Sequence, residues 1–274
     1  MPSPLGLALG LLSSIALPGG PSYVATPAEG TCCLVIAHAA GSISGNVLTN
    51  SREALEANYA IGTRWFEIDL LATSDGVLVA AHDWTNWRRF VGDEGDQAPA
   101  LEEFRARRIV ARASAHGVPG DYAPMTFDDL EAFLARHPDA VVVTDTKGPL
   151  ADVEAAVAAS PRREQFVLQA YSVAEVAGLA ERGFGGRIIL TLYKLPVAYD
   201  DALVEPFLAE VAPVRHALAG FTVPLSFAAR GDNIRRLSGD DGTRVYVHGQ
   251  PNEINAREVQ AAMAARGASG FYLD

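Results

Sequence analysis

The feature that most constrains the fold is a regular alternation of short, β-branched apolar runs with longer amphipathic segments. The runs cover residues 32–38, 64–71, 141–147, 166–171, 187–192, 220–225, 244–248 and 270–274. The amphipathic segments cover residues 51–61, 126–137, 150–159, 172–182, 200–218, 226–238 and 252–266. Eight strands separated by seven helices predict an α/β fold, the (β/α)8 TIM barrel. An open doubly wound sheet is the alternative, but no Gly-rich phosphate turn supports it.

Two segments depart from this rhythm. A further run at residues 77–82 follows the second strand after Ser74-Asp75-Gly76. Asp-Gly between two strands is typical of a hairpin, so we expect a return strand outside the barrel. Residues 83–124 then form a long insertion. An insertion at this point predicts a lid or substrate loop, with a solvated surface excursion as the alternative.

The N-terminal 30 residues differ in character from the rest. No charged side chain precedes Glu29, and residues 5–17 form an apolar run. This run is too short for an integral membrane span but has the length of a secretory signal core. We therefore divide the chain into a candidate signal peptide at residues 1–30 and a barrel domain at residues 31–274. Export is one expectation; a segment that packs on the domain of a cytoplasmic protein is the other.

The charge of the chain restricts its partners. The 33 acidic residues outnumber 22 Lys plus Arg, which gives a net charge of −11. Sequence-independent nucleic-acid binding needs a basic surface, so we expect no nucleic-acid partner. An anionic substrate would need a local cation to overcome this field, either a metal ion or a basic side chain.

Polar residues gather where the predicted strands end, which is where barrel enzymes place their sites. Glu67 and Asp69 are two residues apart on one strand and therefore face the same side. Asp145 and Lys147 repeat this spacing on the next barrel strand. Each pair alone fits a solvated edge or a salt bridge. Together they indicate a site for one hard divalent cation, Mg²⁺ or Ca²⁺, held by Glu67, Asp69 and Asp145.

Two histidines flank this acidic cluster. His38 ends the first predicted strand and His82 ends the return strand. A lone histidine at such a place is usually structural, but two beside a metal site indicate general acid and general base catalysis. A metal ion, two histidines and Lys147 as a phosphate contact together predict cleavage of a phosphodiester.

The same residues carry a resemblance to a known family. The chain contains His38-Ala39-Ala40-Gly41, Thr49-Asn50-Ser51, Phe66-Glu67-Ile68-Asp69, Ser74-Asp75-Gly76-Val77 and Ala81-His82-Asp83. Asp145-Thr146-Lys147, Gln169-Ala170-Tyr171-Ser172 and the closing strand at residues 267–274 follow. In order and spacing this series resembles the glycerophosphodiester phosphodiesterase family, which groups with the phosphatidylinositol-specific phospholipase C barrels. The similarity runs from about residue 34 to the C-terminus.

The resemblance implies a metal-dependent phosphoric diester hydrolase with a TIM barrel. Its substrate would be a small glycerophosphodiester, a lysophospholipid or a similar lipid-head-group diester. The implied roles are His38 and His82 as the acid–base pair, Glu67, Asp69 and Asp145 as metal ligands, and Lys147 as a phosphate contact. Asn50 would fix the loop after the first strand and belongs to the substrate-binding set. Gln169 belongs to the same set. His248 lies in a segment that departs from the family, and we expect it either to contact the substrate or to be a histidine at the rim of the barrel.

The sequence also departs from the family pattern. Ala39 replaces the usual Arg after the first histidine, Thr49 replaces a Glu, and His248-Gly249-Gln250-Pro251-Asn252 replaces a Trp-Thr-x-Asn segment. These differences concern the substrate more than the reaction. Two alternatives therefore stand beside hydrolysis. One is a sphingomyelinase D or phospholipase D-like enzyme that transfers or cyclises the phosphate, and the other is a catalytically inactive binding domain.

Overall fold

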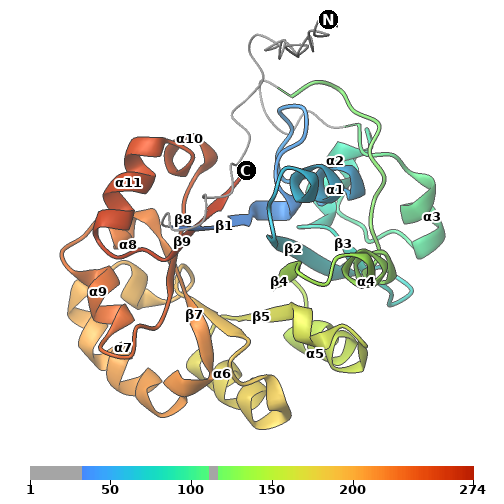
Figure 1. Ribbon diagram of the computed structural model, residues 1–274. Coiled ribbons are helices and arrows are strands. Elements are labelled where there is room, and N and C mark those ends of the chain that lie inside the picture. Colours follow the sequence, from blue (N-terminus) through green and yellow to red (C-terminus); the bar gives the residue numbers. More distant parts are fainter. Residues whose placement is uncertain (1–32, 111–116) are drawn as a thin grey trace, which may run out of the picture.

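The structure, a computed structural model, describes residues 33–110 and 117–274 of the chain. Within these residues the strands close into a barrel surrounded by helices (Figure 1). The expectations for the apolar segment at residues 1–30 lie outside the described residues. No helix in the described part is long and apolar enough to cross a membrane.

The barrel consists of eight parallel strands, as the sequence predicted. Their order around the barrel is β1, β9, β8, β7, β6, β5, β4 and β2, and pairing of β1 with β2 closes the ring. The strands are β1 (Leu34–Ala37), β2 (Trp65–Ala72), β4 (Val141–Thr146), β5 (Phe166–Ala170), β6 (Ile188–Thr191), β7 (Leu218–Pro224), β8 (Val245–His248) and β9 (Gly270–Leu273). The predicted return strand is β3 (Leu78–Ala80), which pairs antiparallel with β2 outside the ring.

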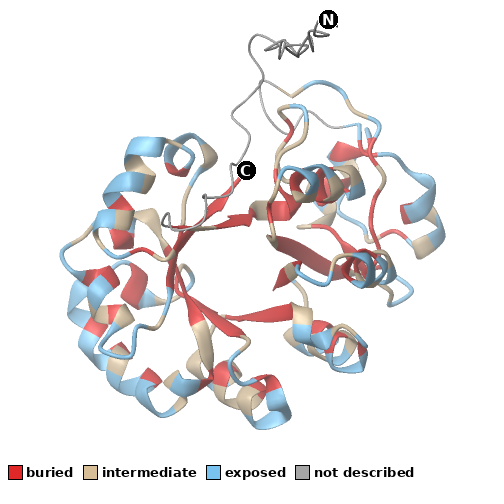
Figure 2. Cartoon of the chain, in the orientation of Figure 1, coloured by how far each residue is buried: buried red, intermediate tan, exposed pale blue. Residues whose placement is uncertain are grey.

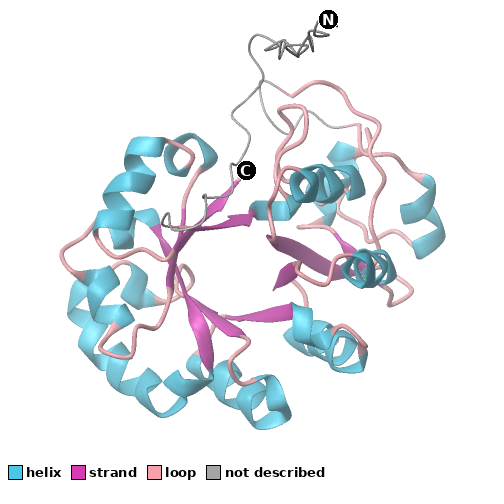
Figure 3. Cartoon of the chain, viewed as in Figure 1, coloured by secondary structure: helices cyan, strands magenta, loops and turns pink. Residues whose placement is uncertain are grey.

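The helices form the outer layer (Figure 3). They are α1 (Arg52–Ala60), α2 (Trp84–Phe90), α3 (Leu101–Ala106), α4 (Phe127–Arg136), α5 (Leu150–Ala159), α6 (Val173–Leu179), α7 (Val204–Val211), α8 (Leu225–Ala228), α9 (Asn233–Ser238), α10 (Pro251–Ile254) and α11 (Arg257–Ala265). A π-helical turn at Ala180–Phe184 extends α6, and short 3₁₀ turns lie at His38–Ala40, Arg163–Gln165, Pro196–Ala198, Asp201–Leu203 and Ala212–Ala217.

Strand periodicity divides the core into two parts. Along β2, Phe66, Ile68 and Leu70 pack outward in the main core cluster, beneath the helices. The alternate residues Trp65, Glu67 and Asp69 therefore face the barrel interior. The lower interior is apolar, with Ile36, Val143, Val167, Ile189, Tyr246 and Tyr272 in one buried cluster. The strands are accordingly buried on both faces, whereas the helices expose their outer surfaces (Figure 2).

The insertion after β3 is folded rather than open. Within its described residues, α2 and α3 share a small apolar cluster in which Trp87 stacks on Phe104 at 5.2 Å. Arg88 of α2 forms ion pairs with Glu103 of α3 and with Asp93 in the segment between the two helices. Asp83 begins α2 by accepting a hydrogen bond from the Asn86 backbone N–H. The insertion therefore has its own core and forms a fixed wall at the carboxyl end of the barrel.

The loop between β1 and α1 is the most strained part of the described chain. All five non-glycine residues with positive φ lie here: Ala39, Ala40, Ser44, Leu48 and Asn50. Such conformations are unfavourable for residues with a β-carbon and persist only where surrounding contacts impose them. The buried Asn58 amide supplies such contacts, because it donates to the carbonyls of Ala40 and Ser42 at 3.1 and 3.0 Å. Gly41 approaches this amide so closely that a β-carbon would lie 2.6 Å from it.

We predict that Asn58→Ala lowers the free energy of unfolding by about 2 kcal/mol, because it leaves buried carbonyls without donors. Urea denaturation with an unchanged m-value would measure this loss. The exposed neighbour Ala57 supplies the control, since Ala57→Ser should change stability by less than ~0.5 kcal/mol. Equal stability of the two variants would show that Asn58 does not hold the loop.

Candidate active site

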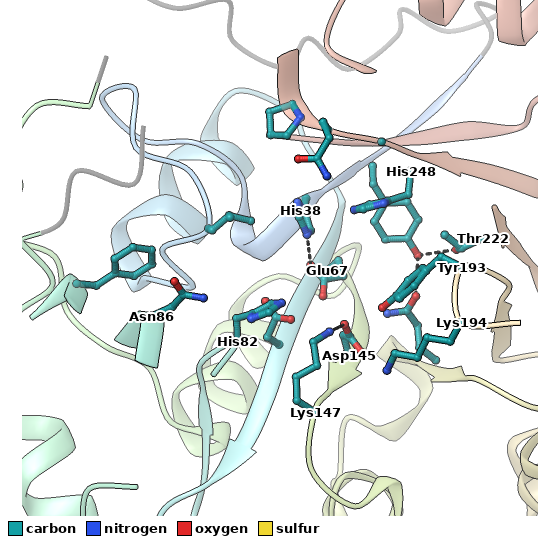
Figure 4. Close-up of a pocket in the computed structure, with 18 residues that line it drawn as sticks. His38, Glu67, His82, Asn86, Asp145, Lys147, Tyr193, Lys194, Thr222 and His248 are labelled. Atoms are coloured by element: carbon teal, nitrogen blue, oxygen red, sulfur yellow. Dashed lines mark hydrogen bonds and ion pairs between the residues drawn. The ribbon is translucent and has the colours of Figure 1, made fainter. Parts of the chain in front are cut away.

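A cavity of about 390 Å³ opens at the carboxyl ends of the barrel strands. Its lining includes both predicted histidines, the three predicted metal ligands, Lys147, Gln169 and His248 (Figure 4). Side chains from β2, β4, β5, β7, β8 and β9 thus converge on one space with His38, which directly follows β1. The insertion adds Asn86 and Phe90 to its wall. The sequence-based grouping of these residues into one site agrees with their placement.

Three buried carboxylates lie at the centre. Glu67 and Asp69 project inward from β2, and Asp145 projects from β4 in direct register with Asp69. One oxygen from each lies within 4.8 Å of the others. Their side chains are nearly inaccessible to solvent, and three such charges repel one another strongly in a buried site. The sequence predicted this triad correctly as a cluster because parallel pairing aligns strand ends.

Hydrogen bonds hold each carboxylate in place. The Ala39 backbone N–H donates to Glu67 Oε2 at 2.8 Å. The Asn50 amide donates to Asp69 at 2.9 Å, and its oxygen accepts from the Asp69 backbone N–H. Asn50 thus orients a carboxylate, and it is not among the residues that line the cavity, where a substrate-binding residue was expected.

The carboxylates need a cation to remain ionised together. Burial raises the pKa of Glu67 well above its usual value, and the neighbouring Asp69 charge raises it further. Burial and the charge of Asp145 likewise raise the pKa of Asp69. Three oxygen ligands within reach of one ion are what Mg²⁺ and Ca²⁺ prefer. The donor set therefore fits one hard divalent cation.

His38 is held between two acidic groups. Its Nδ1 forms a 3.1 Å hydrogen bond with Asp274 Oδ1. Its Nε2 faces the acidic cluster and lies 3.9 Å from Glu67 Oε2. Burial lowers the pKa of His38, but the Asp274 hydrogen bond and the charges of Glu67 and Asp69 outweigh it and raise the pKa to about 9. The histidine is therefore fixed in orientation and is protonated in the absence of a bound cation.

His82 has a comparable partner on the opposite side of the cavity. Its Nδ1 shares a 2.6 Å hydrogen bond with Asp83 Oδ2. The same carboxylate accepts hydrogen bonds from Asn86, which fixes it at the start of α2. His82 is more accessible than His38, with 37% of its side chain exposed against 18%. Each histidine thus presents one ring nitrogen to the cavity while a carboxylate holds the other.

The remaining predicted residues occupy different parts of the cavity. Lys147 forms a 2.7 Å ion pair with Asp145, which raises the lysine pKa although burial opposes the shift. Gln169 accepts a hydrogen bond from Thr191 at 2.7 Å in the barrel interior. The His248 ring lies 5.1 Å from that of His38, edge to face. Burial, with the charge of His38, lowers the pKa of His248 to about 4, so this ring is neutral.

Several contributors were absent from the predicted site. Asp274 and Asp83 orient the histidines, and Tyr171 donates a short hydrogen bond to Asp145 while sharing another of 3.0 Å with Tyr193. Tyr193 and Lys194 also line the cavity. All of these except Lys194 follow or end a strand, or neighbour a predicted histidine. That position was the available signal, but residue type alone does not distinguish a positioning carboxylate or tyrosine from a solvated one.

We predict that Glu67→Gln is more stable than wild type without a divalent cation and less stable than wild type when the cation is bound. In EDTA the variant should melt about 2 °C or more above wild type, because a buried, repelled carboxylate is removed. With Mg²⁺ or Ca²⁺ at 100 times the dissociation constant, wild type should gain ~2.7 kcal/mol, and the variant should gain much less. Thermal melts with and without each ion would measure both effects.

The exposed Glu258 on α11 offers a matched control for this experiment. Glu258→Gln removes the same charge far from the acidic cluster and should respond to the cation as wild type does. An identical cation response in Glu67→Gln and wild type would rule out Glu67 as a ligand.

The chain is similar to known proteins in part of its sequence and in its fold. The model of the "Glycerophosphoryl diester phosphodiesterase family" matches residues 42–174, which include β2, β3 and β4. No curated protein matches the chain in sequence. Solved structures match almost the whole barrel, although they share little sequence.

Three of these structures illustrate the similarity. A glycerophosphoryl diester phosphodiesterase from Parabacteroides distasonis has 17% identity and a TM-score of 0.69, over 91% of this chain and 85% of its own. A glycerophosphodiester phosphodiesterase from Agrobacterium tumefaciens has 20% identity and a TM-score of 0.62, over 89% and 96%. An Oleispira antarctica phosphodiesterase, solved with the product sn-glycerol-3-phosphate, has 16% identity and a TM-score of 0.62, over 88% and 92%.

The two kinds of comparison support different parts of the conclusion. The structural neighbours confirm the TIM-barrel fold along the chain. The family model covers the segment that carries Asn50, Glu67, Asp69, His82 and Asp145. The predicted similarity to the glycerophosphodiester phosphodiesterase family is confirmed, and with it the assignment of the chain to the phosphoric diester hydrolases.

Proposed function

We propose that the protein hydrolyses small glycerophosphodiesters with the help of one divalent cation. The observation that carries this proposal is the combination in one cavity of a buried carboxylate triad with two carboxylate-held histidines. Lys147 stands beside the triad and would contact the phosphate. Similarity to a phosphodiesterase that was solved with sn-glycerol-3-phosphate supports glycerol phosphate as one half of the substrate.

Glu67, Asp69 and Asp145 would hold the cation. When bound, it would neutralise charge on the phosphate and on the oxygen that leaves. Lys147 places an ammonium beside Asp145 and would bind a second phosphate oxygen. Asn50 and the Ala39 N–H keep the carboxylates aimed at the ion.

The two histidines would move the protons. His38 and His82 each keep Nδ1 on a carboxylate, which leaves Nε2 for exchange with the reacting groups. One Nε2 would accept a proton from the attacking water or substrate hydroxyl, and the other would donate a proton to the departing alkoxide. Asp274 and Asp83 would stabilise the protonated ring that each transfer requires.

The cavity also suggests which substrates to test. Its volume suits a small diester, and Leu48, Phe90 and Pro251 provide apolar wall. These residues would also accept the first carbons of a lysophospholipid chain. Glycerophosphodiesters and lysophospholipids should therefore be compared directly.

We predict that His38→Ala and His82→Ala each lower kcat on a cleaved diester by about 10²–10⁴-fold, because each removes one proton-transfer group. EDTA should abolish turnover, and Mg²⁺ or Ca²⁺ should restore it. His216→Ala changes an exposed histidine remote from the cavity and should keep wild-type kinetics. Wild-type turnover in both cavity variants would exclude this mechanism.

The products would distinguish the remaining alternatives. Hydrolysis in ¹⁸O water should place the heavy oxygen in the phosphomonoester product, whereas transfer to a neighbouring hydroxyl should release a cyclic phosphate without it. A cyclic product would favour the phospholipase D-like alternative. Cation binding without turnover on any diester would favour a binding domain.

A further inference from the structure

The lysines of the chain are distributed unevenly. Only two of its 22 basic Lys and Arg residues are lysines, Lys147 and Lys194, and both line the cavity. Among the described residues, the surface ion pairs that involve Lys or Arg all use arginine. The one lysine ion pair in this part of the chain is that of Lys147 with Asp145, inside the cavity. The cavity therefore holds two compact ammonium groups that differ in their surroundings.

Lys147 is neutralised by the site itself. A divalent cation, when bound, and the Lys147 ammonium would together supply three positive charges, which would balance Glu67, Asp69 and Asp145. Lys194 differs from Lys147, because none of the ion pairs among the described residues includes it, and Asp145 and Glu175 act on it only at longer range. Burial and the charge of Lys147 lower the pKa of Lys194, and the more distant charges of Asp145 and Glu175 only partly oppose this shift.

The surroundings of Lys194 are aromatic. Its Nζ lies 3.7 Å from the ring centroid of Tyr171 and 5.8 Å from that of Tyr193. Cation–π attraction of this kind is also how proteins recognise quaternary ammonium ligands. Here the chain's own ammonium occupies the Tyr171 face, so a choline group would meet a like charge instead of an open ring.

The tyrosines are fixed in this arrangement. Tyr171 donates to Asp145, and its hydroxyl also shares a hydrogen bond with Tyr193. Tyr199 in turn donates to the backbone carbonyl of Tyr193 at 2.7 Å. Lys194, which is exposed, therefore lies over a fixed tyrosine ring and lines the cavity near Asp145 (Figure 4).

We propose that Lys194 selects phosphodiesters that carry a second anionic group, a carboxylate or a phosphate, on one of their alcohols. This inference rests on the proposed function and specifies its substrate class. The scissile phosphate would lie at the cation and Lys147, and the second anion would reach Lys194. A choline diester would be disfavoured by repulsion at the same place.

Three diesters of glycerol 3-phosphate would test this proposal, esterified to glycolate, to ethylene glycol and to choline. They share the reacting half and differ in the charge of the second alcohol, which is −1, 0 and +1. Wild type should show the highest kcat/KM with the glycolate diester and the lowest with the choline diester, at least about tenfold apart. Lys194→Met should reduce the glycolate-to-choline ratio about tenfold, mainly through KM, and Lys194→Arg should preserve most of it.

Arg105→Met provides the charge-matched control, since Arg105 is exposed on α3, outside the cavity lining, and its loss should leave the ratio unchanged. Equal loss of kcat/KM on all three diesters in Lys194→Met would assign Lys194 to the scissile phosphate and overturn the proposal. A wild-type preference for choline, or an unchanged ratio in Lys194→Met, would overturn it as well.

Binding separates this inference from the proposed function. Calorimetry with His82→Ala protein and a divalent cation would measure the affinity of each diester without turnover. If the His82→Ala protein binds the glycolate diester more tightly than the other two, and the double variant with Lys194→Met does not, the role of Lys194 is supported. This holds even if wild type hydrolyses none of the three diesters. Equal affinity for all three diesters would overturn the role of Lys194, while turnover by wild type would still uphold the proposed function.

Discussion

The repulsion among three buried carboxylates is the constraint around which the carboxyl end of this barrel is organised. Glu67, Asp69 and Asp145 lie within reach of one another because β2 and β4 pair in a register that sets Asp69 opposite Asp145. Left alone, such a cluster would be protonated or would weaken the fold. A backbone N–H, an amide, a phenol and an ammonium each contact one of its carboxylates, and the donor set also fits a divalent cation.

This arrangement explains the strain in the loop after β1. The Ala39 N–H reaches Glu67 and the Asn50 amide reaches Asp69, and both residues hold positive φ values that a β-carbon disfavours. The Asn58 amide and the close approach of Gly41 hold the loop in that shape. Packing remote from the cavity thus maintains a conformation that serves the acidic cluster, which is the usual place for strain in a functional protein.

Much of the site was predictable because two local rules govern it. Strand periodicity puts Glu67 and Asp69 on one face, and parallel pairing brings the ends of neighbouring strands together. The partners of the site residues were harder to predict. Asp274 reaches His38 across 236 positions of sequence, and Tyr171 reaches Asp145 only because β5 lies next to β4. The segment at residues 226–238 was expected as one helix but forms α8 and α9, because Arg230-Gly231-Asp232 interrupts it.

Local sequence patterns are enough to predict the alternation of strands and helices, the return strand after Asp75-Gly76, and the residue types able to hold a cation and move protons. These features depend on local periodicity and on chemistry that a short motif carries. Tertiary contacts alone determine which carboxylate holds each histidine, that Asn50 orients Asp69, and that Lys194 lies over tyrosine rings. Those contacts depend on barrel closure and strand register. Both bring together side chains that are far apart along the chain, so sequence position does not predict which of them will touch.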